Sequence, residues 1–464
     1  MPHFWEQAVG SGHAPLALRA DYQRQLRQCH EELGFGHVRF HGVLSDDMGT
    51  LVDENNRLLD SFFNADQVFD FLLGIGMKPF VELSFMPRAL ASGGETVFHY
   101  AANVTPPKDY SEWAELIGRL ARHWVERYGV EEVKTWFFEV WNEPNLKAFW
   151  TGTQSDYFKL YQVTAKAIKR VDKGLQVGGP ATAKNGWITE FLDYCARSKA
   201  PVDFVSTHHY PTDALGKAGQ DTQSQLAHSR PSILRDWARA TRRKARGLPL
   251  YYTEWSCSSN PRDPLHDEPY AAAVIVKTMM EARGLAEGYS YWTFSDIFEE
   301  NYMPARAFQG GFGLLTLHGV AKPAYRAFEL LHRLGSEELP VKGKHQTVGV
   351  WMARSPGSVT AMLINHALPR HSIKAETAQI QLTGLKRPAN VYVERIDKNH
   401  ANAKRLWIEM GQPALPTGRE IEQLHAASKL MREPVKWKYE GNTLRLKISM
   451  PAQAVAAVTV ELKR

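Results

Sequence analysis

The chain has 464 residues, 44% hydrophobic and 23% charged, which is the composition of a globular protein with more than one domain. Its formal net charge of +6 is small for this length and gives no reason to expect a nucleic-acid-binding protein. No run approaches the roughly 20 apolar residues that a membrane-spanning helix requires.

The start of the chain has no basic segment followed by an apolar one, which a signal peptide would have. We therefore expect a cytoplasmic protein, or a periplasmic or secreted one if a signal was removed. The three cysteines, Cys29, Cys195 and Cys257, are odd in number and far apart, so we expect no disulfide framework. No metal-ligand spacing accompanies them. The densest basic run, residues 239–247, is typical of the solvated end of a helix.

Short strand-like runs alternate with longer amphipathic segments over the first two thirds of the chain. We predict strands at residues 4–10, 36–42, 78–85, 135–143, 175–181, 203–210, 248–255 and 288–295. Helical patterns lie between them, for example at residues 64–76, 109–129 and 156–171, with Asn64, Asp109 and Ser155 as predicted N-caps. Eight strands alternating with helices predict an α/β fold, a (β/α)8 TIM barrel.

The pattern changes after Leu334. Residues 340–464 contain short β-rich runs separated by turn residues, and residues 443–449 alternate clearly between apolar and polar. We therefore predict a catalytic barrel at residues 1–335 and an accessory C-terminal β-sandwich at residues 340–464 without helices. The segment 335–344 is the predicted linker.

Active sites of such barrels lie at the carboxyl ends of the strands. Acidic, imidazole and aromatic side chains end several of the predicted strands: Arg39 and His41, Asn142 and Glu143, His208, His209 and Tyr210, Glu254 and Trp255, and Trp292 followed by Asp296 and Glu299. Because all these strand ends meet at one rim, we expect one site there. His209 is adjacent to His208 and would face the opposite way.

Two carboxylates flanking a sugar bond carry out glycoside hydrolysis. Glu143 would be the general acid and Glu254 the nucleophile. At a separation of ~5.5 Å and an effective dielectric of ~20, the two charges repel by about 3 kcal/mol. This repulsion is on the order of two pKa units, enough to keep Glu143 protonated near neutral pH while Glu254 stays ionised. This chemistry requires no metal and no cofactor.

Several segments together resemble glycoside hydrolase family 39, of the 4/7 superfamily of retaining glycosidases, and most closely its bacterial β-xylosidases. They are VGSGHAPLALR (9–19), VRFHGVLSDDM (38–48), EVWNEPN (139–145), DFVSTHHYP (203–211), YTEWSCSS (252–259), YWTFSDIFEE (291–300) and GGFGLL (310–315). These segments cover almost the whole predicted barrel. The C-terminal domain resembles that of the family only in being a β-domain, without a matching motif.

The resemblance implies a role for each matching position. Glu143 matches the acid/base and Glu254 the nucleophile. The implied substrate-binding residues are Asn142 (the sugar 2-hydroxyl), His41 and His208 (sugar hydroxyls), Tyr210 (beside the nucleophile) and Glu299 (a distal hydroxyl). Apart from the resemblance, Trp141, Trp255 and Trp292 are candidates for a sugar platform or for packing, and Trp292 is the first choice for the platform. Further candidates are Phe85 and Phe149 as an aglycone wall, Arg39 as a ligand or an anchor for a carboxylate, and Asp296 as a ligand or part of a loop ion pair.

The resemblance leaves the substrate between neutral pentosides and uronic acids. Asp296, Glu299 and Glu300 form an acidic run that would repel a uronate, with Arg306 as the one nearby cation, so β-D-xylosides or xylo-oligosaccharides are expected first. An α-L-iduronidase-like or endo-acting enzyme is the alternative. A catalytically silent glycan-binding barrel is disfavoured because both carboxylates are present. Expected partners are an oligosaccharide or glycoside, with neither nucleic acid nor membrane, and the sequence indicates no oligomeric state.

Overall fold

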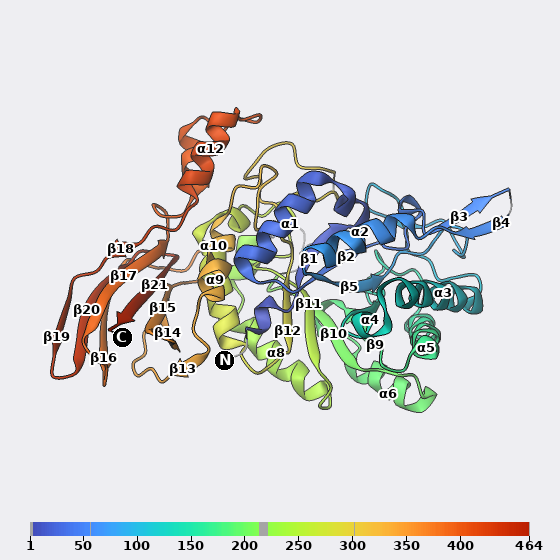
Figure 1. The fold of residues 1–464 in the computed structure, drawn as a ribbon, viewed down its shortest axis with the longest axis horizontal. Helices are drawn as coiled ribbons and strands as arrows, with labels where there is room; N and C mark the ends of the chain where they lie inside the picture. The colour runs from blue at the N-terminus through green and yellow to red at the C-terminus, as the bar shows by residue number, and fades with distance from the viewer. Residues whose placement is uncertain (1–2, 56, 213–220, 301, 464) are drawn as a thin grey trace.

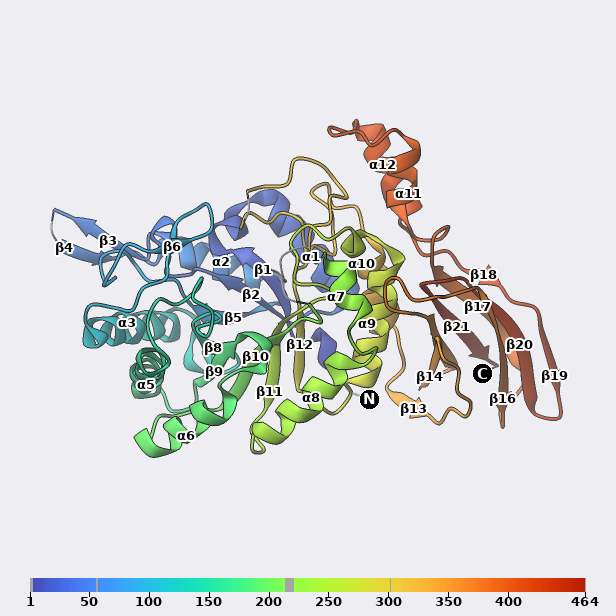
Figure 2. The ribbon, with the colours of Figure 1, turned by 180° about the vertical axis from the view of Figure 1, so that it is seen from behind.

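The computed structural model describes residues 3–55, 57–212, 221–300 and 302–463. A closed parallel barrel carries helices on its outside, and a β-domain packs against one side of the barrel (Figures 1 and 2). The predicted (β/α)8 barrel with an appended β-sandwich is confirmed.

The barrel strands follow the order β1-β12-β11-β10-β9-β8-β5-β2. Their bounds are β1 (Val9–His13), β2 (His37–His41), β5 (Lys78–Leu83), β8 (Phe137–Val140), β9 (Gln176–Thr182), β10 (Phe204–His209), β11 (Leu250–Trp255) and β12 (Gly288–Tyr291). The helices of this part are α1 (Ala20–Leu33), α2 (Phe63–Gly74), α3 (Tyr110–Tyr128), α4 (Val130–Val133), α5 (Gln154–Val171), α6 (Ile188–Ser198), α7 (Thr222–Ala227), α8 (Ile233–Lys244), α9 (Pro269–Glu281) and α10 (Pro323–His332). Two hairpins, β3 (Leu51–Glu54) with β4 (Arg57–Asp60) and β6 (Thr96–Val97) with β7 (Ala102–Asn103), extend from the loops.

All eight predicted strands overlap observed ones, but the first, predicted at residues 4–10, shares only Val9 and Gly10 with β1. Residues 4–6 form a short 3-10 helix, and the strand begins only at Val9. Phe4 and Trp5 are buried, and the ring of Phe4 packs at 5.7 Å against Tyr289 of β12. The apolar pair therefore packs against the barrel without forming a strand of its wall.

One of the three predicted N-caps is confirmed. The side chain of Asp109 accepts a hydrogen bond from the backbone N–H of Ser111. Helix α5 is capped by Thr153 in a reciprocal capping box with Asp156, so the prediction of Ser155 was wrong by two residues. Asn64 lies inside α2, where its amide donates to the carbonyl of Met48.

The interior of the barrel is apolar at its lower end. Phe80, Phe137, Phe204 and Tyr251 from four strands form a buried aromatic cluster, in which the rings of Phe80 and Phe137 stack at 4.8 Å. Polar side chains begin one layer above. The apolar layer therefore supports the polar groups from below and keeps them at the carboxyl rim.

The C-terminal domain consists of two antiparallel sheets. The larger has the order β13-β14-β15-β21-β17-β18 and the smaller the order β16-β20-β19. The strands are β13 (Glu337–Leu339), β14 (Val348–Ser355), β15 (Ser358–Asn365), β16 (Glu376–Thr383), β17 (Pro388–Ile396), β18 (Glu433–Pro434), β19 (Trp437–Glu440), β20 (Thr443–Met450) and β21 (Ala454–Leu462). The first strand of this domain, β13, lies within the segment 335–344 that was predicted as the linker.

The domain also contains two helices, α11 (Ala403–Glu409) and α12 (Gly418–Ala427), so the expectation that the helical pattern ends was wrong. They project from the sandwich (Figure 2). The indole of Trp407 packs against Phe308 of the loop that follows β12, and Lys404 forms an ion pair with Glu268 at 2.5 Å. The insertion thus connects the sandwich to the loops of the catalytic rim.

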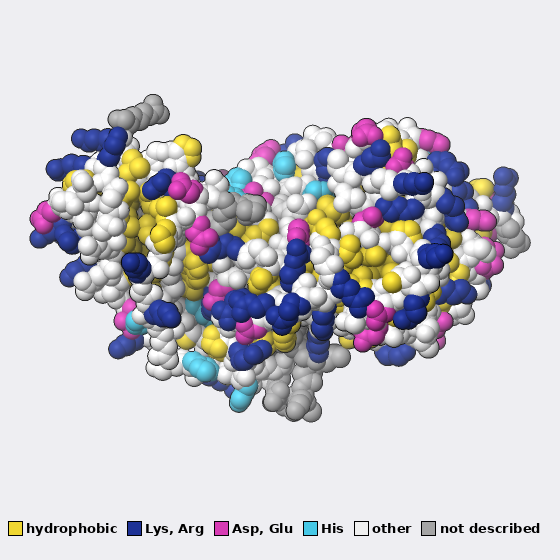
Figure 3. Space-filling view, turned by 90° about the horizontal axis from the view of Figure 1, so that it is seen from below, with side chains coloured by type: hydrophobic (Ala, Val, Ile, Leu, Met, Phe, Trp, Pro, Cys, Tyr) yellow, Lys and Arg dark blue, Asp and Glu magenta, His cyan; other side chains and the backbone are white. Residues whose placement is uncertain are grey.

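Basic residues of the run 239–247 lie in the last turn of α8 and the loop behind it, as predicted. Arg242 pairs with Glu287, and Arg246 with Asp193. On the face that contains α8, acidic side chains lie between the basic ones (Figure 3). Among the described residues, no helix is both long and apolar enough to cross a membrane.

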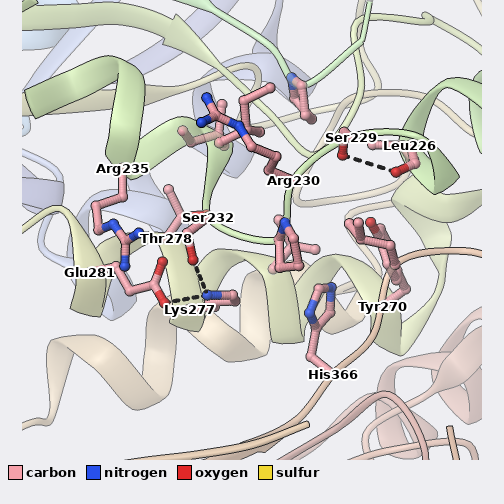
Figure 4. Close-up of a pocket in the computed structure, with 16 residues that line it drawn as sticks. Leu226, Ser229, Arg230, Ser232, Arg235, Tyr270, Lys277, Thr278, Glu281 and His366 are labelled. Carbon is pink, nitrogen blue, oxygen red and sulfur yellow. Dashed lines mark hydrogen bonds and ion pairs between the residues drawn. The ribbon is translucent and has the colours of Figure 1, made fainter. Parts of the chain in front are cut away.

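Barrel and sandwich meet along α9, which contacts β15 and β21. His366 follows β15 and lies beside Tyr270 of α9, with the ring centroids 5.3 Å apart (Figure 4). In the same interface Lys277 donates to Ser232 and pairs with Glu281. His366 is 7% exposed and its Nε2 has no hydrogen-bond partner among the described residues. Burial lowers the pKa of His366 to about 3.

We expect this interface to lose stability in mild acid. Because the folded-state pKa of His366 lies below the unfolded value, protonation favours the unfolded chain, and the loss begins as the pH falls below about 6.5. A pKa near 3 corresponds to a loss of about 2 kcal/mol in the free energy of unfolding between pH 7 and pH 5. Urea unfolding at pH 7 and pH 5 measures this loss. We expect the free energy of unfolding of His366→Phe to fall between the two pH values by about 2 kcal/mol less than that of the wild type. An equal loss in wild type and variant would contradict the prediction.

Candidate active site

The two predicted catalytic carboxylates meet at the carboxyl rim of the barrel. Glu143 follows β8 after a tight bend, in which Trp141 and Glu143 both adopt left-handed backbone conformations (φ 72° and 43°). The backbone N–H of Glu143 donates to the carbonyl of Ala181 at 2.8 Å, which fixes the bend. Strained backbone of this kind at a strand end is common at functional sites. Glu254 is the penultimate residue of β11.

Glu143, Glu254 and His208 each place one polar atom within 4.8 Å of the others. Nδ1 of His208 lies 2.9 Å from Oε1 of Glu143 and 3.6 Å from Oε2 of Glu254. This short separation between the carboxylates is the one that retaining glycosidases use, since an inverting enzyme needs room for a water between them.

His208 is held in one tautomer by Arg39. A nitrogen of the Arg39 guanidinium lies 3.3 Å from Nε2 of His208, and because a guanidinium has only donors, Nε2 must accept. The ring proton therefore lies on Nδ1, which donates toward Glu143. Burial lowers the pKa of His208 to about 4, so the imidazole is neutral at pH 7. The neighbouring His209 faces away, stacked on Tyr252 at 3.8 Å.

Arg39 lies beneath the site and connects four of its residues. Its guanidinium contacts Glu139 at 2.6 Å, Glu82 at 2.7 Å and Glu254 at 2.8 Å, and donates to Oδ1 of Asn142 at 2.9 Å. It is fully buried, so its charge balances buried carboxylates. Of the two roles considered for Arg39, the geometry supports the carboxylate anchor.

The contact with Arg39 also orients Asn142. Because Oδ1 accepts from Arg39, the amide nitrogen of Asn142 is turned to the other side and remains available as a donor. Tyr210 donates its phenolic hydrogen to Oε2 of Glu254 at 2.8 Å, so both oxygens of Glu254 accept hydrogen bonds. Donors to both oxygens stabilise the ionised carboxylate and fix its direction.

Burial is the main reason why Glu143 holds its proton. It raises the pKa of Glu143 to about 7, against the opposing charges of Arg39 and His41. Repulsion by Glu254 was expected to be enough for this shift, whereas the carboxylate that adds most to it is Glu82. Burial also raises the pKa of Glu254, and there His208 and Arg39 oppose it.

His41 connects the nucleophile to two further carboxylates. Its Nδ1 lies 2.7 Å from Glu82, and its Nε2 lies 3.3 Å from Glu300 and 3.9 Å from Glu254. Burial opposes the charged imidazole, but Glu82 and Glu300 outweigh it and raise the pKa of His41 to about 10. His41 is therefore a cation at neutral pH.

Of the adjacent residues Glu299 and Glu300, the one that contacts His41 is Glu300, whereas the distal sugar contact was expected of Glu299. Glu299 is 2.9 Å from Nδ1 of His13, whose Nε2 lies 3.1 Å from Asp47. The ring of His13 stacks on Tyr100 at 3.6 Å. Since this pairing engages one oxygen of Glu299 away from His41, Glu300 is the better candidate for the sugar contact.

Asp296 is engaged in the fold. Its Oδ2 lies 2.7 Å from the ammonium of Lys322, which is fully buried and also pairs with Asp267 at 2.7 Å. Its Oδ1 accepts from the backbone N–H of Gly313 at 2.8 Å. Of the two roles considered for Asp296, the structure supports the loop ion pair.

The aromatic candidates separate into one layer beside the pocket and one behind it. The ring of Trp292 lies 4.9 Å from that of His41 and packs on Phe298. Phe85 is fully buried and lies behind Phe98, with ring centroids 6.2 Å apart. Phe98 also contacts Phe149 at 5.6 Å. Because Phe85 has no exposed surface, Phe98 and Phe149 form the accessible wall.

An open depression of about 530 Å³ lies at the mouth of the site. Its lining residues are Phe98, His99, Asn260, Pro261, Arg262, Glu300 and Tyr302. They come from three separate loops, which include parts of the segments 87–109 and 258–269. The depression reaches Glu300, and its size suits one or two sugar units.

Sequence reasoning missed His13, Glu82, Glu139 and Phe98, and left Glu300 undecided. Glu82 and Glu139 were detectable, because each is a charged residue inside an otherwise apolar strand (VEL and FEV). His13 was not identified as the end of a strand because the first strand was predicted at residues 4–10, several residues before β1. No local signal distinguished Phe98 within its long loop.

Comparisons with known proteins find similar chains along almost the whole length of this one. The model of the family described as Glycosyl hydrolases family 39 matches residues 1–444. A β-xylosidase of Caldicellulosiruptor saccharolyticus is 48% identical, with 99% of this chain and 95% of that protein aligned. A β-xylosidase of Geobacillus stearothermophilus is 38% identical over 99% of this chain and 93% of its own. The crystal structure of a monomeric β-xylosidase from Caulobacter crescentus CB15 superposes with a TM-score of 0.91 at 36% identity, covering 100% of this chain and 97% of that one.

Proposed function

This chain belongs to glycosyl hydrolase family 39 and is a glycoside hydrolase, and we propose that it releases β-D-xylose from β-xylosides or xylo-oligosaccharides with retention of configuration. The observation that carries the mechanism is the pair of carboxylates, Glu143 and Glu254, within 4.8 Å of each other. The names of the similar proteins support the choice of xylose.

In the first step Glu254 attacks the anomeric carbon while Glu143 protonates the departing oxygen. Arg39 and Tyr210 hold the attacking carboxylate in its ionised form. Glu143, with a pKa of about 7, carries its proton at neutral pH or below. The bond from carbon to the leaving oxygen breaks as the covalent glycosyl-enzyme forms.

In the second step a water attacks the same carbon, Glu143 takes its proton, and the bond from the carbon to Glu254 breaks and frees the carboxylate. Glu254 is then an ester without charge, so its repulsion of an ionised Glu143 is removed. His208 donates from Nδ1 toward Glu143, which favours the ionised carboxylate that acts as base. Two inversions give overall retention.

The sugar itself would be bound by polar groups around Arg39 and His41 that can still form hydrogen bonds to a ligand. The amide nitrogen of Asn142 is available for the 2-hydroxyl, and Glu300 with His41 for hydroxyls farther along the ring. Trp292 would provide the apolar face. Charged hydrogen bonds to neutral hydroxyls provide orientation and strength.

The charges of the site favour a neutral sugar over a uronate. Arg39 and His41 are the cations that contact Glu254, and each is already paired with two or more carboxylates. Arg306, the cation considered for a uronate, is solvent-exposed outside this buried cluster. A uronate would therefore add a negative charge beside Glu300 without a free partner in the cluster.

The first test is hydrolysis of 4-nitrophenyl β-D-xylopyranoside, with 4-nitrophenyl β-D-glucopyranoside and 4-methylumbelliferyl α-L-iduronide in parallel. We expect kcat/KM to be highest for the xyloside. Proton NMR of the first product should show β-xylose before mutarotation. Turnover of the iduronide in preference to the xyloside would refute the substrate, and α-xylose as the first product would refute retention.

A further inference from the structure

A second cluster of metal-binding side chains lies far from the catalytic rim, at the lower end of the barrel. It consists of His3, at the start of the described chain, Glu6 in the first 3-10 helix and His332 at the end of α10. Their ligand atoms lie within 4.8 Å of one another. Residues 3 and 332 are separated by most of the barrel sequence, so no ligand spacing along the chain predicts this group.

Both imidazoles converge on one carboxylate oxygen. Nδ1 of His3 lies 2.6 Å and Nδ1 of His332 2.9 Å from Oε1 of Glu6. Metal–ligand bonds of about 2.0–2.2 Å place neighbouring ligand atoms about 3.0–3.4 Å apart. The three groups therefore need only small side-chain movements to surround an ion.

The backbone around the cluster leaves space for it. Gly34, which ends α1 with φ +75°, faces both partners: a Cβ there would lie 2.6 Å from Nδ1 of His332 and 3.0 Å from Oε2 of Glu6. Any larger residue would displace the imidazole. The ring of His3 is held by stacking on buried Trp5 at 4.6 Å.

The three side chains are 19%, 20% and 36% exposed for His3, Glu6 and His332, so an ion could enter and keep water ligands. Two imidazoles and one carboxylate suit a borderline divalent transition metal, whereas Mg²⁺ and Ca²⁺ prefer oxygen ligands throughout. We propose that His3, Glu6 and His332 form a binding site for Zn²⁺ or a similar ion, which fastens the start of the chain to the last barrel helix.

The proposal is independent of the catalytic assignment and predicts a stabilising ion. An ion that binds only the folded chain raises the melting temperature, by on the order of a few degrees at a hundredfold excess over its Kd.

The test uses full-length protein without a histidine tag, stripped with chelator and dialysed against dilute ZnCl₂. Zinc per chain is measured by mass spectrometry and Tm by calorimetry for wild type, His332→Gln, Glu6→Gln and the control His228→Gln, a histidine on the exposed surface outside the cluster. Any zinc held by Glu143, His208 and Glu254 is common to all four proteins and cancels in the comparison.

We expect wild type and His228→Gln to bind one more zinc than the other two variants and to gain stability with ZnCl₂ but not with MgCl₂. Unchanged turnover of the xyloside in zinc-free buffer will show that the variants are folded. If His332→Gln does not fold, His3→Gln, at the margin of the chain, replaces it. Equal zinc uptake by wild type and cluster variants, or an equal Tm shift, would overturn the proposal.

Discussion

Glu254→Ala is expected to lower kcat for 4-nitrophenyl β-D-xylopyranoside by about 10⁴-fold or more, since it removes the carboxylate that would form the covalent intermediate. Among the described residues, Glu143 is the one other carboxylate that His208 joins to this position, and burial keeps it protonated. Initial rates at saturating substrate and matched protein concentration would measure the loss.

Azide provides a second measurement on the same variant. The shortened side chain leaves space beneath the anomeric carbon, where azide can attack from the side that Glu254 used. The expected product is the α-xylosyl azide, formed by a single inversion. Glu299→Gln is the matched control, because it alters a carboxylate of the same rim that pairs with His13, and we expect its kcat to stay within about tenfold of wild type. A β-azide from Glu254→Ala would mean that the two roles are exchanged.

Glu143→Gln should produce a loss that depends on the leaving group. General acid catalysis contributes about 10²–10⁴-fold, so kcat/KM for xylobiose should fall by that factor. A 2,4-dinitrophenyl xyloside leaves without protonation, and its kcat/KM should change little. Its kcat should still fall, because the second step needs Glu143 as base, and the glycosyl-enzyme should accumulate as a burst. Equal losses in kcat/KM for both substrates would contradict the acid role.

The pH profile tests the same residue. The acid must carry its proton in the first step, so kcat/KM of the wild type for xylobiose should fall as the pH rises through about 7, the pKa of Glu143 in the free enzyme. Glutamine at this position cannot lose a proton, so the fall should be absent from the residual xylobiose activity of Glu143→Gln. The wild type with the dinitrophenyl substrate, which leaves without protonation, is a second control and should also show no fall. A fall at the same pH in the variant would assign that titration to another group.

The sequence by itself determined the barrel and the positions of its two main carboxylates. The pattern of short strand-like runs between longer amphipathic segments is a local property, and seven of eight strands were placed correctly from it. In a barrel the carboxyl ends of all strands meet at one rim, so Glu143 and Glu254 were brought together once each was placed at the end of a strand. Helix α12 was also detectable, since Thr417 and Glu420 form a local capping box.

Only the tertiary structure decided what surrounds these carboxylates. The charge of Arg39 is shared among Glu82, Glu139 and Glu254, which come from three strands, and no pattern within one strand specifies that sharing. The pKa of Glu143 depends on burial by the whole rim, and the choice between Glu299 and Glu300 on which of two histidines lies nearer. Electrostatic interactions act through space, and the distances that set their strength are fixed by the packing of residues remote in the chain.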